Sequence, residues 1–229
     1  TEMGDLMQRT SLSVNIKERL DFSCALLDRE ANLVVNAPHI PVHLGSLGIC
    51  VRTLLKKLPM RPGDTVVTNH PAYGGSHLPD ITLVTPVYNF RNKLIGYVAN
   101  RAHHAEIGGT RPGSMPPDAQ NLAQEGVLIP PMYLVEQGVP NWSGIASLLQ
   151  TAPYPTRCLQ DNLADLHAAL AANLLGVRLL QRLASTFGLR QVRHYMQQLT
   201  AYSAALIKTK LLQLPDGLYS ATELLDDGT

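Results

Sequence analysis

The stretch ITLVTPVYNFRNKLIGYVANRAHH, residues 81–104, holds two apolar runs on either side of a short polar link. The runs are rich in valine, isoleucine, threonine and tyrosine, which are residues that strands prefer. The link NFRNK is short enough to join two antiparallel neighbours. The stretch therefore predicts a β-hairpin, and its second strand ends on two consecutive histidines.

More strands and helices are predicted on both sides of this hairpin. Residues 105–155 are rich in glycine and proline and show little periodicity, which inside a compact domain usually marks a functional segment. Because strands come first and long helices follow, the order indicates an α+β fold and not alternating βαβ units. Strands are expected at residues 22–28, 32–37 and 65–70, and helices at residues 5–20, 44–58, 156–187 and 189–212.

The chain divides into two regions by composition. We expect a mixed sheet within an α+β region at residues 1–155, which carries the candidate site, and a helical region at residues 156–229. The final stretch LYSATELLDDGT, residues 218–229, has the pattern of a strand that has just begun. Such a strand has no partner here, so we expect the chain to be a fragment of a larger domain.

The overall composition argues against several classes of function. The 229 residues carry 19 basic and 18 acidic side chains, a balance that does not favour nucleic acid or an anionic membrane as a partner. No long apolar run and no signal-peptide pattern is present, so we expect a cytoplasmic protein without a transmembrane helix. The three cysteines, Cys24, Cys50 and Cys158, form no CxxC pair and are expected to be buried, reduced thiols.

A group of residues suited to metal chemistry surrounds the predicted hairpin. The loop PAYGGSHLPD, residues 71–80, brings His77 and Asp80 to the start of the first strand. Pro79 fixes its own φ angle and favours an extended residue before it, so the loop is stiff and the two side chains can converge. The pattern HxxD is short and is also common in polar surface loops, which leaves a structural role open.

The two histidines at the end of the hairpin extend this pattern. Side chains alternate along a strand, so His103 and His104 cannot both face one pocket, and the sequence does not decide which of them does. Two imidazoles and a carboxylate form a suitable ligand set for Zn²⁺, Mn²⁺ or Fe²⁺. Glu106 is a candidate for a further ligand, a partner of a ligand, or a general base.

Other polar residues near this group have open or structural roles. His43 stands at a predicted helix start and either faces the same pocket or satisfies the local backbone. Arg101 shares the face of His103 and either binds a substrate carboxylate or forms a structural salt bridge. The Gly-rich residues 108–117 lack the GK[ST] of a P-loop. Structural or surface roles are expected for His39, Asp161, Asn162, Asp165, His167 and His194.

Several long, ordered motifs together resemble the hydantoinase B/5-oxoprolinase family, and in particular the C-terminal half of ATP-dependent 5-oxoprolinases. The resemblance extends from about Met3 to Gly217. The motifs are NIKERLDFSCALLD, NAPHIPVHLGS, GDTVVTNHPAYGGSHLPDITLVTPV, VANRAHHAEIGGTRPGSMPP, QEGVLIPP and DNLADLHAALAANLLG.

The resemblance implies a divalent metal, Zn or Mn, with ligands at His77, Asp80 and either His103 or His104. It also implies a hydantoinase A-like ATPase partner, which binds ATP and Mg and phosphorylates the substrate, so this chain alone is expected to be inactive. The family often shows HHADIGG where this chain has HHAEIGG. That difference puts a ligand role for Glu106 in question.

The activity implied by the resemblance is ATP-dependent hydrolytic opening of a cyclic amide, converting 5-oxo-L-proline to L-glutamate. Glu106, Arg101 and His43 are then candidates for the catalytic roles. Two alternatives stay open. The chain could be a non-catalytic scaffold whose long helices form an interface in a homo- or hetero-oligomer. It could also be the metal-containing subunit of an acetone or acetophenone carboxylase-like enzyme.

Overall fold

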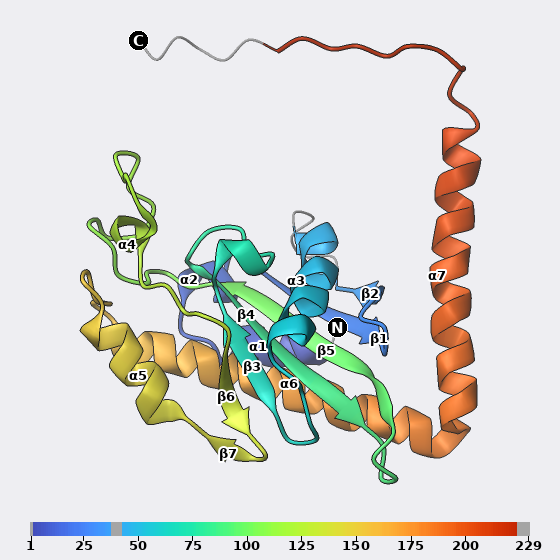
Figure 1. Cartoon of the computed structure of the whole chain (residues 1–229), viewed down its shortest axis with the longest axis horizontal. Coiled ribbons are helices and arrows are strands. Elements are labelled where there is room, and N and C mark those ends of the chain that lie inside the picture. Colours follow the sequence, from blue (N-terminus) through green and yellow to red (C-terminus); the bar gives the residue numbers. More distant parts are fainter. Residues whose placement is uncertain (1, 38–42, 224–229) are drawn as a thin grey trace.

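The computed structural model describes residues 2–37 and 43–223, and within that range it has a seven-stranded antiparallel sheet (Figure 1). The strands lie in the order β2-β1-β5-β4-β3-β6-β7. Every pairing between them is antiparallel, so the α+β class is confirmed but the sheet is not mixed. The strands are β1 Phe22–Asp28, β2 Leu33–Asn36, β3 Thr65–Thr68, β4 Asp80–Tyr88, β5 Leu94–His103, β6 Met132–Glu136 and β7 Val139–Pro140.

Helices cover both faces of this sheet. Helix α3 lies over one face, and the long helix α6 runs across the other with α1 against it (Figure 1). Leu47 and Val51 of α3 pack with Val84, while Leu166 and Ala169 of α6 belong to a second buried cluster. The helices are α1 Glu2–Thr10, α2 Val14–Lys17, α3 His43–Lys57, α4 Leu122–Glu125, α5 Trp142–Thr151, α6 Leu159–Phe187 and α7 Leu189–Leu211, with a 3-10 turn η1 at Pro71–Tyr73.

The predicted hairpin is confirmed as β4 and β5, the two central strands. Their register places Asp80 opposite His103 and Thr82 opposite Arg101. Residues two apart on a strand share a face, so these four side chains lie on the same side of the sheet. Contacts of Asp80 with His43 and of Arg101 with Ser46 identify that side as the α3 face.

The predicted helix at residues 5–20 is wrong in its continuity, because α1 ends at Thr10 and α2 begins at Val14. The backbone N–H groups of Leu12 and Ser13 donate to Asp165 Oδ1 at 2.7 and 3.2 Å. This tertiary contact replaces the internal hydrogen bonds of a continuing helix. Asp165 therefore stabilises a distant helix break and not the start of its own helix.

The segment 105–155 contains more regular structure than its composition predicts, since α4, β6, β7 and α5 all lie within it. The apolar side chains of Leu134, Ile145 and Leu149 anchor it in the main core. At the other end, residues 218–223 form no strand, and residues 224–229 lie outside the described residues, as does His39.

Helix α6 is long and apolar enough to cross a membrane by composition alone. Its residues Leu166, Ala169 and Ala172 are instead buried against the sheet and α1, which makes it a core helix. Helix α7 packs on the sheet only near its start, where Val192 and Met196 are buried with Val98. The rest of the helix extends away from the sheet (Figure 1). The three cysteines are free, as expected, but Cys158 is exposed.

Candidate metal centre

The carboxylate of Asp80 lies at the centre of a cluster of imidazoles. Asp80 is the first residue of β4, where the stiff loop after η1 enters the sheet. The Nδ1 atom of His77 lies 3.4 Å from Asp80 Oδ2, and Nδ1 of His103 lies 3.3 Å from Asp80 Oδ1. The rings of His77 and His103 meet edge to face, with centroids 4.8 Å apart. The structure thus brings together three of the predicted ligands.

His43 approaches the same carboxylate from the start of α3. Its Nε2 lies 3.4 Å from Asp80 Oδ2, and its Nδ1 lies 3.0 Å from the hydroxyl oxygen of Ser23 on β1. The side chain is buried. Of the two positions left open for His43, the structure shows the one that faces the same group as His77 and His103.

Asp21 is a further candidate for the site, and sequence reasoning missed it. Donor atoms of Asp21, His43 and Asp80 all lie within 4.8 Å of one another. Asp21 directly precedes β1, and its backbone carbonyl accepts a hydrogen bond from the N–H of His103 at 2.9 Å. The pairing of β1 with β5 brings Asp21 close to Asp80. No spacing of residues in the sequence predicts that pairing. We call these five residues, Asp21, His43, His77, Asp80 and His103, the Asp80 cluster.

The charge state of Asp80 suits a cation. Burial by itself would raise the pKa of this carboxyl, but hydrogen bonds from His103 and His43, together with the charges of His77 and His43, outweigh it and lower the pKa. Asp80 is therefore ionised at neutral pH, which is the state in which carboxylates bind metals.

The arrangement of donor atoms also fits a metal ion. Two ligand atoms that each lie about 2.0–2.1 Å from a tetrahedral ion are about 3.3 Å apart. His77 and His103 each lie at about that spacing from a different oxygen of Asp80, 3.4 Å from Oδ2 and 3.3 Å from Oδ1, and one donor atom of each of the three residues lies within 4.8 Å of the other two. The buried Nδ1 of His77 faces Asp80 but makes no hydrogen bond within the described chain. An unsatisfied buried nitrogen is costly unless something binds it.

His104 points away from the Asp80 cluster. Its Nδ1 lies 2.6 Å from Oδ1 of Asn162 on α6, on the opposite side of the sheet from α3. Burial lowers the pKa of this fully enclosed imidazole. The strand alternation expected from the sequence thus separates the two histidines, and it is His103 that lies beside Asp80.

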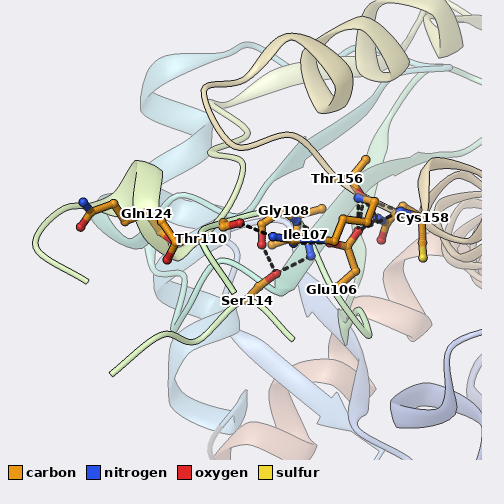
Figure 2. Close-up of polar contacts among 11 residues, drawn as sticks. Glu106, Ile107, Gly108, Thr110, Ser114, Gln124, Thr156 and Cys158 are labelled. Carbon is orange, nitrogen blue, oxygen red and sulfur yellow. Dashed lines mark hydrogen bonds and ion pairs between the residues drawn. The ribbon is translucent and has the colours of Figure 1, made fainter. Parts of the chain in front are cut away.

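Glu106 lies in a separate hydrogen-bond network, which Figure 2 shows. Its carboxylate accepts hydrogen bonds from the Thr156 hydroxyl, from the N–H groups of Arg157 and Cys158 just before α6, and from Gly108 N–H at 2.9 Å. The same carboxylate forms an ion pair with Arg157 at 3.4 Å. Although burial opposes it, these hydrogen bonds lower the pKa of Glu106.

Through these contacts the Glu106 carboxylate links the loop after β5 to the start of α6. Asn162 links Glu106 to His104, and we call these residues, with Thr156 and Arg157, the Glu106 network. Ser114 supports the same loop, since it accepts from Ile107 N–H and donates to the Gly108 carbonyl (Figure 2). The structure does not bring Glu106 to the Asp80 cluster, where a ligand or general base would be needed.

Arg101 is fully buried on the same face of the sheet as His103, two residues before it on β5. Its nitrogens donate to Thr82, Ser46 and Gly74, all of them neutral acceptors. No carboxylate in the described part of the chain forms an ion pair with it. Neither expected role, binding a substrate carboxylate or forming a structural salt bridge, matches this environment.

Comparisons with known proteins agree with the motifs. Residues 1–229 match the family model for hydantoinase B/oxoprolinase. The 5-oxoprolinase 1 of Arabidopsis thaliana is 46% identical over 96% of this chain, and the match covers 18% of that protein. The chain therefore spans about a fifth of the length of this relative.

Two solved structures share the fold. The ATP-dependent caprolactamase from Pseudomonas jessenii superposes with a TM-score of 0.87 at 30% identity, over 99% of this chain and 38% of that one. The caprolactamase subunit beta of Pseudomonas jessenii is 32% identical over 99% of this chain, and the match covers 38% of that protein. A nucleotide-free acetone carboxylase superposes with a TM-score of 0.75 at 16% identity, over 86% of this chain and 26% of that one, which shows a shared fold alone.

Proposed function

The chain belongs to the hydantoinase B/oxoprolinase family, and from that membership we propose that it is the metal-bearing part of an enzyme that opens a cyclic amide by ATP-dependent hydrolysis. The similar proteins support this class of substrate, since they include 5-oxoprolinases and a caprolactamase. The higher identity to the 5-oxoprolinase favours 5-oxo-L-proline, with L-glutamate as product.

The observation that carries this proposal is that the buried carboxylate of Asp80 belongs to two groups of possible metal ligands, one with His77 and His103 and one with Asp21 and His43. His77, Asp80 and His103 would hold a divalent ion, Zn or Mn, while Asp21 and His43 form a second candidate ligand group with the same Asp80. When bound, such an ion supplies Lewis-acid chemistry, which activates water and polarises an amide carbonyl.

The chain's own residues then bind and orient. The ionised carboxylate of Asp80 fixes the positions of three imidazoles through its two oxygens. His43 is placed to hold or release a proton at Nε2, because its Nδ1 is oriented by Ser23. Glu106 is not required for either task, and its proposed role is to fasten the loop after β5 to α6.

A partner is needed for the energetically difficult step. We propose a hydantoinase A-like ATPase, as a subunit or as a further part of a longer chain in the cytoplasm. It transfers the terminal phosphoryl group of ATP to the amide oxygen. ADP leaves, water adds to the amide carbon, and the ring C–N bond breaks as the nitrogen takes up a proton, which leaves an acyl phosphate. A second water then hydrolyses this acyl phosphate and releases phosphate and the open amino acid. The chain alone is therefore expected to be inactive.

The proposal is tested by metal analysis and by a reconstituted assay. The chain should retain a stoichiometric divalent ion after dialysis, measured by mass spectrometry of the metal, and His77→Ala should lose it. Together with its ATPase partner, it should release glutamate from 5-oxoproline only when ATP is present. If the wild-type chain takes up no metal under any loading condition, the proposed mechanism is wrong.

A scaffold role is a second candidate, and the surface of α7 favours it. Large apolar side chains are exposed along this helix, at Tyr195, Leu199, Tyr202, Leu206 and Ile207. A reconstituted enzyme carrying Asp80→Asn separates the two functions. Full ring-opening activity in that variant would favour the scaffold, whereas loss of activity in an intact complex would favour the metal centre.

A further inference from the structure

The guanidinium of Arg101 makes three separate hydrogen bonds. Its Nε donates to Thr82 Oγ1 at 2.8 Å, its Nη1 to Ser46 Oγ at 2.7 Å, and its Nη2 to the Gly74 carbonyl at 2.7 Å. The side chain is among the largest fully buried ones in the described chain. All three acceptors belong to the protein itself.

Each acceptor belongs to a different segment, and each segment carries a member of the Asp80 cluster. Thr82 follows Asp80 by two residues on β4, and Gly74 lies in the loop that carries His77. Ser46 lies in the first turn of α3, where its hydroxyl also donates to the carbonyl of His43 at 3.2 Å.

We propose that Arg101 is a positioning residue that fixes the segments of the metal centre relative to one another and does not itself contact substrate. Arg101 itself stands two residues before His103 on β5. Its side chain therefore connects four segments that each carry a candidate metal ligand: β5, β4, the loop before β4, and the start of α3. The guanidinium is planar and its donors point in fixed directions, so three bonds define three positions at once. This inference rests on the metal centre proposed above.

The neutrality of the acceptors has a consequence for the site. A buried cation is ordinarily paired with a carboxylate. Here neutral oxygens satisfy Arg101. Within the described residues no arginine forms an ion pair with Asp80 or Asp21, which leaves both carboxylates available to a metal.

The loop is also held from its other side. Gly74 has a φ angle of +84°, and a Cβ atom there would lie 2.9 Å from the backbone of Cys50 on α3. The loop therefore packs directly on α3, and the Gly74 carbonyl has little freedom to move away from the guanidinium.

The test uses two variants. Arg101→Lys keeps the positive charge but loses the planar guanidinium with its several N–H donors, and Ser46→Ala removes one acceptor. Arg193→Lys is a matched control, because Arg193 donates to the Leu94 carbonyl at 2.6 Å at the far end of β5. Binding of Zn²⁺ is measured by competition with a chelator, binding of Co²⁺ by its visible absorption spectrum, and folding by thermal unfolding.

We expect Arg101→Lys to weaken Zn²⁺ binding by about 10–100-fold, as for other residues that orient metal ligands, and to change the Co²⁺ spectrum. Ser46→Ala should weaken binding to a smaller degree, and the Arg193 control should match wild type. Wild-type affinity and spectrum in both Arg101→Lys and Ser46→Ala would overturn the positioning role. If Arg101→Lys does not fold, Ser46→Ala alone decides.

A second measurement separates this inference from the proposed function. If the wild-type chain binds no metal, the proposed metal centre is wrong. The positioning role of Arg101 is then tested by comparing crystal structures of the wild type and Arg101→Lys. Arg101→Lys should displace His77 and His43 relative to Asp80 while the β4–β5 hairpin stays in place. Unchanged positions of both histidines would overturn the inference.

Discussion

The Asp80 cluster and the Glu106 network each place a buried carboxylate near histidine, yet the two carboxylates have different hydrogen-bond partners. In the Glu106 network the carboxylate accepts from two backbone N–H groups before α6, from Gly108 N–H and from a threonine hydroxyl. In the Asp80 cluster imidazole nitrogens surround the carboxylate, and His77 Nδ1 makes no hydrogen bond within the described residues.

This contrast separates a structural acid from a candidate ligand. A carboxylate whose acceptor sites are filled by backbone donors contributes to folding, because removing it leaves several buried N–H groups unpaired. A carboxylate surrounded by groups that are themselves metal ligands gains most when a cation arrives. Residue type alone would have assigned both acids to one site.

The largest expected effect is that of Asp80→Asn. The amide keeps the size of the side chain but removes the charge at the centre of the cluster. We expect metal affinity to fall by more than the roughly 10–100-fold typical of residues that only orient ligands. Competition with a chelator measures it. Glu106→Gln is the matched control, and equal losses in the two variants would contradict the distinction between the two regions.

His103→Ala and His104→Ala test the same distinction at adjacent positions. His103→Ala should abolish stoichiometric metal binding, because it removes an imidazole 3.3 Å from Asp80. His104→Ala should keep the metal but lower the free energy of unfolding by about 1–3 kcal/mol, since it leaves Asn162 without its buried partner. Metal content and denaturant unfolding are measured on both. A reversed pattern would make His104 the ligand.

Glu106→Gln should lower stability by about 1–3 kcal/mol, through loss of charge-assisted hydrogen bonds, and leave metal content intact. The pKa of Glu106 is lowered in the folded state. Its stabilisation is therefore present above the unfolded pKa of about 4.3 and is lost as the pH falls through the folded value. The stability gap between wild type and variant should shrink at acid pH. A gap that does not change with pH would mean that the charge is unimportant.

The secondary structure was predictable from the sequence wherever strand composition or helical spacing was clear. The β4–β5 hairpin, β1 and the two long helices follow from strand composition and helical spacing, and alternation required His103 and His104 to face opposite ways. The position of Asp21 was not predictable, because it depends on β1 pairing with β5. The break after Thr10 was also missed, since a carboxylate more than a hundred residues away stabilises it.

The smallest expected effects come from two hydroxyl groups, one beside each of the two regions. Ser23 contacts His43 at the Asp80 cluster, and Thr156 donates to Glu106. Ser23→Ala should weaken metal binding a few-fold, because His43 loses its orienting contact. Thr156→Val should cost about 1 kcal/mol of stability without changing metal affinity, because one hydrogen bond of the Glu106 network is removed. Titration with Zn²⁺ and denaturant unfolding, applied to both variants, test the pair. If Thr156→Val weakened metal binding as much as Ser23→Ala does, the two regions would be coupled and the Glu106 network would belong to the metal centre.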